Sequence, residues 1–298
     1  MRIESVELRR LRLPLVAPFR TSLGTEHHRD VLLVHVVTAA AEGWGECVAF
    51  GGPYYSSEYT DGAQDVIRAH LLPRLFAHGH VEADDVATIL RPVRGHPMAK
   101  AAVEMAILDA ELRASDTSLG EFLGAVRTEV DCGVSVGIHD DVADLLRTVE
   151  RHLEEGYRRI KLKIEPGTDV EPVRAVREHF GDVPLQVDAN AAYSRQNANR
   201  LAELDEFDLL LIEQPLPEED LLGHAELAKA VRTPICLDES ITSARVAADA
   251  PRLDVHDAAG AQGDRVGRDA RGGDRLVEAD RRPHRLRELR VAEQVLLR

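Results

Sequence analysis

Hydrophobic and polar positions follow two successive patterns along the chain. In residues 1 to about 60, apolar and polar side chains alternate from Ile3, Val6 and Leu8 onward, and this period of two predicts three antiparallel strands with Gly-rich turns. Apolar positions then recur at helical spacing in residues 61–76, 83–91 and 97–114. Strands followed by helices predict an α+β domain over residues 1–125.

From residue 126 onward the pattern changes to short apolar runs separated by amphipathic segments. The runs predicted to be strands are residues 130–138, 159–164, 184–190, 209–215 and 234–240. Near-continuous apolar strands that alternate with helices indicate a parallel sheet, and the absence of a Gly-rich phosphate loop favours a (β/α) barrel. We therefore predict an α/β chain in which residues 126–250 form an incomplete TIM-type barrel of about five βα units.

Residues 251–298 differ in composition from the rest of the chain. They contain 11 Arg and 9 acidic residues but no Lys, Ile, Cys or aromatic residue. Because so little apolar surface cannot offset the entropy lost on ordering, we expect an Arg-rich, disordered tail. Out-of-frame reading of a GC-rich gene would produce the same bias, so we interpret the tail as aberrant.

The charge and cysteine content exclude several classes of protein. The 52 Asp and Glu residues outnumber the 37 Lys and Arg residues, and the net charge of −15 would repel nucleic acid and an anionic membrane. No apolar run approaches the roughly 20 residues that span a bilayer, so we expect no membrane partner and a cytoplasmic location. Cys47, Cys132 and Cys236 lie far apart and predict three buried thiols rather than a disulfide or a thiolate metal site.

Four charged residues recur every 25 positions at the ends of predicted strands: Lys163, Asp188, Glu213 and Asp238. Equal βα units place equivalent positions at equal heights, so these side chains should meet at the carboxyl end of the barrel, where barrel enzymes build their sites. Three converging carboxylates repel one another unless a cation lies between them, and oxygen ligands favour Mg²⁺. Taken singly, the aspartates could instead cap helices and the glutamate could be an ion-pair partner.

Two lysines occupy alternate positions of one predicted strand. Lys161 and Lys163 therefore point into the barrel interior, while Ile160, Leu162 and Ile164 face the outer helices. A lysine beside Mg²⁺ and a second lysine has a lowered pKa, so its neutral amine can accept a proton near pH 7. A divalent ion that holds a substrate carboxylate would stabilise the enediolate formed when the α-carbon loses its proton.

These motifs resemble the enolase superfamily. The matching segments are Lys161-Leu162-Lys163, Asp188-Ala189-Asn190, Glu213-Gln214-Pro215 and Leu237-Asp238-Glu239-Ser240, with further matches at residues 17–25, 43–47 and 132–138. Within the superfamily they are similar to the muconate-lactonising subgroup, and most of all to the o-succinylbenzoate synthase / N-acylamino acid racemase family. The resemblance covers residues 1 to about 250.

The resemblance implies a capping domain that determines substrate specificity and a barrel that holds the catalytic groups. It implies that Asp188, Glu213 and Asp238 bind Mg²⁺, that Lys163 is the acid/base, and that Lys161 helps to hold the substrate carboxylate. The residues implied to contact a small carboxylate substrate are Ser135, Asn190, Phe19, Leu23, Phe50 and Tyr55. In the intact family a homo-oligomer is also consistent with the resemblance.

The chain departs from the family after its fifth predicted strand. The family has a second catalytic lysine on the sixth strand, but the repeat places Gly263 there and no lysine follows Lys229. The resemblance favours a Mg²⁺-dependent o-succinylbenzoate synthase-type dehydratase of menaquinone biosynthesis, since syn elimination can use Lys163 alone. N-acylamino acid racemisation, which needs proton donors on both faces, is the alternative. A third hypothesis is a catalytically dead partial barrel, because five strands leave open edges and an incomplete core.

Overall fold

The computed structural model describes residues 1–250 and His256–Asp257, and the chain divides into two compact units. Met1–Pro18 and Glu26–Val130 form the first unit, whereas Phe19–Thr25 groups with the residues from Asp131 onward. This short segment belongs to the second unit because it hydrogen-bonds there; the carbonyl of Arg20, for example, accepts from the amide of Ile138 at 2.9 Å. Within the described part of the chain, no helix combines the length and apolarity needed to span a bilayer.

A three-stranded sheet forms the base of the first unit, as the alternating pattern predicts. Its strands, in sheet order, are β1 (Ile3–Thr21), β2 (Gly24–Thr38) and β3 (Glu42–Cys47). β2 pairs antiparallel with β3. The period of two is visible in the burial of β2, where Leu32, Val34 and Val36 are fully buried in the core of this unit.

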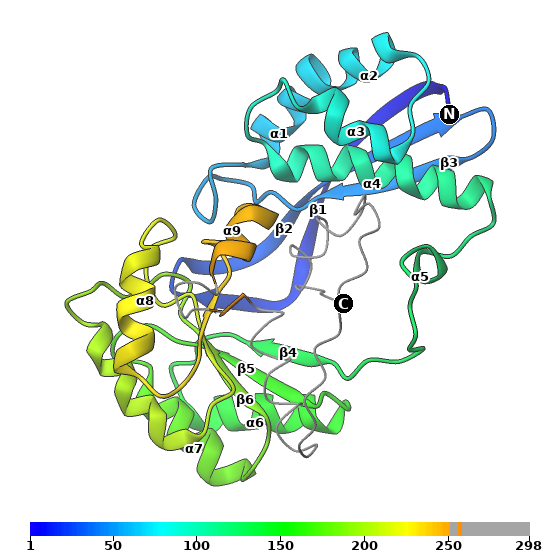
Figure 1. Ribbon diagram of the computed structural model, residues 1–298. Coiled ribbons are helices and arrows are strands. Elements are labelled where there is room, and N and C mark those ends of the chain that lie inside the picture. Colours follow the sequence, from blue (N-terminus) through cyan, green and yellow to red (C-terminus); the bar gives the residue numbers. More distant parts are fainter. Residues whose placement is uncertain (251–255, 258–298) are drawn as a thin grey trace, which may run out of the picture. The chain divides into compact units, whose positions relative to one another are not determined.

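One of the helices of this unit packs against the sheet, and the other helical segments pack against that helix or against one another (Figure 1). The helical segments are α1 (Thr60–Val66), the π-helical segment η1 (Ile67–Leu71), α2 (Leu72–His78), α3 (Ala83–Leu90), α4 (Pro97–Ala114) and α5 (Leu119–Phe122). α4 lies directly on β3 because Gly43 and Gly45 have no side chain. A Cβ added at either glycine would collide with a carbonyl oxygen of α4, that of Ala106 or that of Ala102. Glycine is therefore required at both positions for this close approach.

The second unit contains a parallel sheet with strands at the five predicted places. These strands follow chain order in the sheet and are β4 (Gly133–Val136), β5 (Arg159–Lys163), β6 (Leu185–Asp188), β7 (Ile212–Glu213) and β8 (Ile235–Leu237). A further strand, β9 (His256–Asp257), pairs in parallel with β8 and was not expected. The remainder of residues 251–298, for which we expected disorder, lies outside the described residues.

Helical segments separate these strands along the chain, and α6 and α7 lie beside the sheet (Figure 1). The segments are α6 (Val142–Glu154), α7 (Val170–Phe180), the 3₁₀ segment η2 (Ala198–Phe207), α8 (Leu221–Ala230) and α9 (Ala244–Asp249). Ile160, Leu162 and Ile164 of the β5 region are buried in one cluster with Val149 of α6 and Val173 of α7. The predicted outward face of β5 is therefore confirmed.

Two of the three cysteines are buried thiols. Cys47 and Cys236 are buried, whereas Cys132 is exposed, so the prediction is wrong for Cys132. This residue lies just before β4, beside Asp131, in a stretch whose side chains face solvent. Burial raises the pKa of the Cys47 thiol to about 11, which keeps that thiol protonated near neutral pH.

Candidate active site

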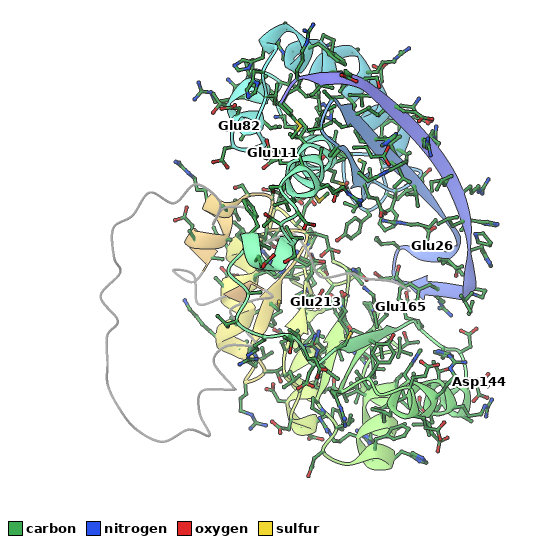
Figure 2. All side chains as sticks on the ribbon, turned by 90° about the vertical axis from the view of Figure 1, so that its right-hand side faces the viewer. Glu26, Glu82, Glu111, Asp144, Glu165 and Glu213 are labelled. Carbon is green, nitrogen blue, oxygen red and sulfur yellow. The ribbon has the colours of Figure 1, made fainter. Side chains whose placement is uncertain are left out.

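Adjacent strands place three of the predicted site residues in one row at the carboxyl end of the parallel sheet. Lys163 in β5 lies opposite Asp188 in β6, which lies opposite Glu213 in β7, so the 25-residue repeat gives equal heights as predicted. Glu213 lies opposite Cys236, however, and Asp238 is therefore two residues farther along, just beyond the end of β8. Figure 2 shows Glu213 at the same end of this unit as Glu165, which lies two residues beyond the end of β5.

The lysines and two of the carboxylates form a buried ion-pair cluster. Nζ of Lys163 lies 2.6 Å from Oδ2 of Asp188, and Nζ of Lys161 lies 3.2 Å from the same atom and 2.9 Å from Oε1 of Glu213. The exposed fractions of the side chains are 1% for Asp188, 8% for Glu213 and 10% for Lys163. Both lysines are therefore interior groups, as predicted from their alternate positions on one strand.

Neither aspartate caps a helix. The side chains that cap α6, α7, α8 and α9 belong to Asp141, Asp169, Asp220 and Ser243. Asp188 instead accepts a hydrogen bond from the amide of Asn190 at 3.0 Å, in the turn after β6. The ion-pair interpretation of Glu213 is confirmed by its contact with Lys161, and an ion pair is compatible with a metal-binding role.

Negative charge exceeds positive charge in this cluster. Two lysines face four carboxyl groups, because Asp238 and Glu239 act electrostatically on the other members. Burial, together with the nearby carboxylates of Asp188 and Asp238, raises the pKa of Glu213 to about 7. Burial and the carboxylates of Asp238 and Asp188 raise the pKa of Glu239 to about 8. Such an excess of buried carboxyl groups is the electrostatic setting in which a cation binds.

The pKa of Lys161 moves in the opposite direction from the one expected of a lysine beside Mg²⁺. Burial lowers this pKa, but Asp188 and Glu213 outweigh the effect of burial and raise the pKa above its ordinary value. Lys161 is surrounded by carboxylates in this structure, and its ammonium group supplies the positive charge between them. We conclude that Lys161 remains protonated here.

The donor chemistry of Asp188, Glu213 and Asp238 fits a hard divalent cation. All three carry carboxylate oxygens at or just beyond the ends of consecutive strands, which is the ligand type that Mg²⁺ prefers. In the described residues, however, no three His, Cys, Asp or Glu side chains are close enough together to hold a metal ion. Lys161 contacts both Asp188 and Glu213, and Asp238 lies beyond the row that they form. The assignment of these three ligands therefore stays a prediction.

Glu239 is a fourth carboxyl group at this site, and sequence reasoning did not select it. Its Oε1 accepts from Nδ2 of Asn190 at 3.0 Å, and Oδ1 of Asn190 accepts from Nζ of Lys163 at 2.7 Å. Alternation along a strand would point Glu239 away from Asp238, but β8 ends at Leu237 and alternation does not extend so far. The signal in the sequence was the adjacent acidic pair itself.

Gln214 is a second residue that the sequence did not single out. It is fully buried, and its Oε1 accepts from the amides of Asp238 at 2.8 Å and Ser240 at 3.2 Å. Its Nε2 donates to Oγ of Ser240 at 2.8 Å. The φ of 37° at Gln214 lies in the left-handed region, which residues other than glycine adopt where the surroundings hold them there. Gln214 thus joins the carboxyl end of β7 to that of β8.

The six residues implied to contact substrate are distributed over both units. Ser135 in β4 lies opposite Lys161, and its Oγ is buried without a hydrogen-bond partner among the described residues. Asn190 is buried beside Lys163, and Phe19 and Leu23 belong to the segment that groups with the second unit. The other two, Phe50 and Tyr55, lie in the first unit with ring centroids 5.1 Å apart. Their contacts with substrate remain predictions.

Both units match known families. Residues 4–124 match the mandelate racemase / muconate lactonizing enzyme N-terminal domain, and residues 144–271 match the enolase C-terminal domain-like family. An N-succinylamino acid racemase from Amycolatopsis sp. is 62% identical over 254 residues, which is 85% of this chain and 69% of that protein. An o-succinylbenzoate synthase from Geobacillus stearothermophilus is 45% identical over 242 residues, 81% of this chain and 64% of that protein.

Solved structures of enolase-superfamily members also match this chain. A crystal structure of an enolase-superfamily member from Enterococcus faecalis V583 has a TM-score of 0.78 and 41% identity, and the match covers 85% of this chain and 69% of that one. A second, from Listeria innocua, has a TM-score of 0.79 and 35% identity and covers 88% of this chain and 73% of that one. The chain thus spans about two thirds of the length of the curated relatives that it matches.

Proposed function

Because this chain belongs to the enolase superfamily, in its mandelate racemase / muconate lactonizing enzyme family, we propose that it removes the α-proton of a small carboxylate substrate. We further propose the o-succinylbenzoate synthase-type dehydration of menaquinone biosynthesis as the reaction. The observation that supports this most directly is Lys163, an interior lysine that contacts Asp188 and Asn190 at the carboxyl end of a parallel sheet. Relatives named for dehydration and for racemisation both match the chain.

Lys163 is the proposed proton-transfer residue. Its amine, once neutral, would take the proton from the α-carbon and then return it to the hydroxyl group that leaves from the same face. Asp188 and Asn190 hold that amine at 2.6 and 2.7 Å, so its position is set before substrate arrives. Lys161 lies on the same strand face and would attract the substrate carboxylate. Ser135, whose buried Oγ has no partner among the described residues, would donate to the substrate.

Asp188, Glu213 and Asp238 are the residues that would hold Mg²⁺. When bound, the ion would stabilise the negative charge that develops on the substrate carboxylate as the α-proton leaves. Four carboxyl groups against two lysines support this assignment, because negative charge exceeds positive charge in the cluster. The proposed partner is therefore a small carboxylate that Mg²⁺ and Lys161 would attract. Nucleic acid and an anionic membrane are not proposed as partners, because the net charge of −15 would repel both. We also propose a cytoplasmic homo-oligomer, as the family resemblance suggests.

Racemisation of N-succinylamino acids is the second candidate. It is supported by the relative of that name, which is 62% identical to this chain. Racemisation requires a proton donor on the face of the substrate opposite Lys163, and Gly263 stands where the 25-residue repeat places the second lysine of the family. We therefore propose that racemisation is more strongly impaired than dehydration in this chain. A catalytically dead partial barrel is the third candidate.

One experiment separates the three candidates. The purified chain is incubated with Mg²⁺ in D₂O, and NMR follows both the formation of o-succinylbenzoate from its hydroxylated precursor and the entry of deuterium at the α-carbon of an N-succinylamino acid. Mg²⁺-dependent dehydration supports the first proposal, and deuterium entry with inversion supports the second. If neither reaction occurs, both catalytic proposals fail for these substrates, which supports the dead partial barrel. The Lys163→Ala variant is the control for contaminating enzymes.

A further inference from the structure

We propose that Glu239 is a positioning residue for Lys163 and that it acts through Asn190. The proposal rests on the function proposed above, in which Lys163 transfers the proton. Two hydrogen bonds connect the three residues in a line: Nδ2 of Asn190 donates to Oε1 of Glu239 at 3.0 Å, and Oδ1 of Asn190 accepts from Nζ of Lys163 at 2.7 Å. A side-chain amide has one donor end and one acceptor end. By accepting from the donor end, Glu239 turns the acceptor end toward the lysine amine.

The backbone of Asn190 is held in place by its neighbours, so the orientation of the side-chain amide is what remains to be fixed. Its φ of 43° lies in the left-handed region, which a residue other than glycine keeps where neighbouring groups hold it. The amide of Asn190 donates to Oδ1 of Asp188 at 3.0 Å, and its carbonyl accepts from Oγ of Ser22 at 3.3 Å. With the backbone held from both sides, two groups fix which end of the side-chain amide faces which way: Lys163 donates to Oδ1, and Glu239 accepts from Nδ2.

A contribution to the stability of the fold does not explain why a buried glutamate is present at position 239. Its Oε2 is buried and has no hydrogen-bond partner within the part of the chain that the structure describes. A buried carboxyl oxygen without a partner destabilises a protein, because the contact with water that it loses is not replaced. Retaining such a group next to Asn190 and Lys163 is instead what a positioning role requires.

The test measures how fast each lysine amine is acylated by acetic anhydride, with the sites mapped by mass spectrometry on the full chain. The exposed Lys229 is the internal reference for the labelling of Lys163. An amine that donates to two acceptors is held away from the reagent. Glu239→Ala removes one of the two contacts that hold the amide of Asn190 and so loosens its grip on Lys163; labelling of Lys163 relative to Lys229 should rise roughly threefold to tenfold, the range that corresponds to one lost hydrogen bond.

Two further variants test whether the position of the acceptor oxygen of Glu239 determines the labelling ratio. Glu239→Gln keeps an oxygen acceptor in place and should leave the labelling ratio near that of the parent. Glu239→Asp keeps a carboxyl group but withdraws its oxygen by one methylene group, so it should raise the ratio as Glu239→Ala does. It replaces that variant if the alanine form does not fold. The opposite pattern would overturn the proposal: Glu239→Gln would raise the ratio, and Glu239→Asp would leave it unchanged.

A double-mutant cycle shows whether Glu239 acts through Asn190. Asn190→Ala should raise the labelling of Lys163 by itself, and adding Glu239→Ala to it should then have no further effect. Additive effects, or no effect of either change, would contradict the proposal. Lysine labelling does not require turnover. If the parent chain is inactive in the D₂O experiment, the proposed function fails, but the labelling ratios still decide whether Glu239 positions Lys163.

Discussion

Lys163 and Asp188 face each other across two adjacent parallel strands, with 2.6 Å between the ammonium nitrogen and Oδ2. One is the proposed proton-transfer residue and the other is a proposed metal ligand. Their 25-residue separation is one βα unit, so the repeat that places them at equal height also brings them into contact. A cation bound to Asp188 would therefore act directly on the electrostatic surroundings of Lys163.

Glu213→Gln should weaken Mg²⁺ binding by at least about tenfold, a change of the size seen when groups at a metal site are altered. The amide cannot supply the negative charge that offsets the dehydration of the ion. Isothermal titration calorimetry with MgCl₂ measures the effect. The matched control is Glu219→Gln, which alters an exposed side chain in the loop after β7 and should bind as the parent does. Equal affinities for the two variants would show that Glu213 is not a ligand.

Lys163→Ala should lose α-proton exchange by roughly 10²- to 10⁴-fold, the usual contribution of a positioned base. Lys161→Ala should retain a measurable rate, because Lys161 orients the substrate and does not take the proton. Deuterium entry from D₂O, followed by NMR at saturating substrate, compares the two variants. Exchange by Lys163→Ala near the parent rate would mean that the proton goes elsewhere.

Gly45→Ala should destabilise the first unit by about 1–3 kcal/mol or more, because the new methyl group collides with the carbonyl of Ala102 in α4. Urea unfolding followed by the fluorescence of Trp44, the single tryptophan of the chain, reports on this contact. Gly120→Ala in α5 is the control, since a Cβ added there would lie 3.7 Å from the Cβ of Ala125, an ordinary van der Waals contact. A Gly45→Ala chain as stable as Gly120→Ala would show that α4 can move away from β3.

Asp220→Asn should reduce the dependence of stability on pH in acid. Hydrogen bonding by Arg195, with Nε 2.7 Å from Oδ2, lowers the pKa of Asp220 from 3.8 to about 2. Because the folded pKa is below the unfolded one, the stabilisation is complete above about pH 4 and is lost as the pH falls through 2. The difference in unfolding free energy between parent and variant should therefore shrink from about pH 5 to about pH 2.

Denaturant unfolding at a series of pH values measures this difference. Glu226→Gln, which alters the other carboxylate that contacts Arg195, is the control and should show a much smaller change over the same interval. A constant difference between the parent and Asp220→Asn across the acid range would show that the Arg195 contact is not maintained in solution.

Much of the fold follows from local patterns, and part of the site does not. Alternating apolar and polar positions predicted β2, and a short apolar run predicted β5. The 25-residue repeat placed Lys163, Asp188 and Glu213 in one row. The repeat failed for Asp238 because the pairing of β7 with β8 shifts by two residues, which no local pattern encodes. Grouping of Phe19–Thr25 with the second unit likewise depends on partners more than 100 positions away in the chain.

The hydrogen bonds of Gln214 affect how far the chain between Glu213 and Asp238 can change in length without disturbing the candidate site. It directly follows Glu213, and its side chain receives the amide of Asp238 from 24 positions away. The spacing of those two carboxylates is thus maintained by a bridge across the sheet rather than by the length of the intervening helix and loops. Insertions or deletions around α8 can accumulate without separating the two acidic residues, whereas a change at Gln214 would remove the side-chain link and leave the backbone pairing of β7 with β8 to hold them.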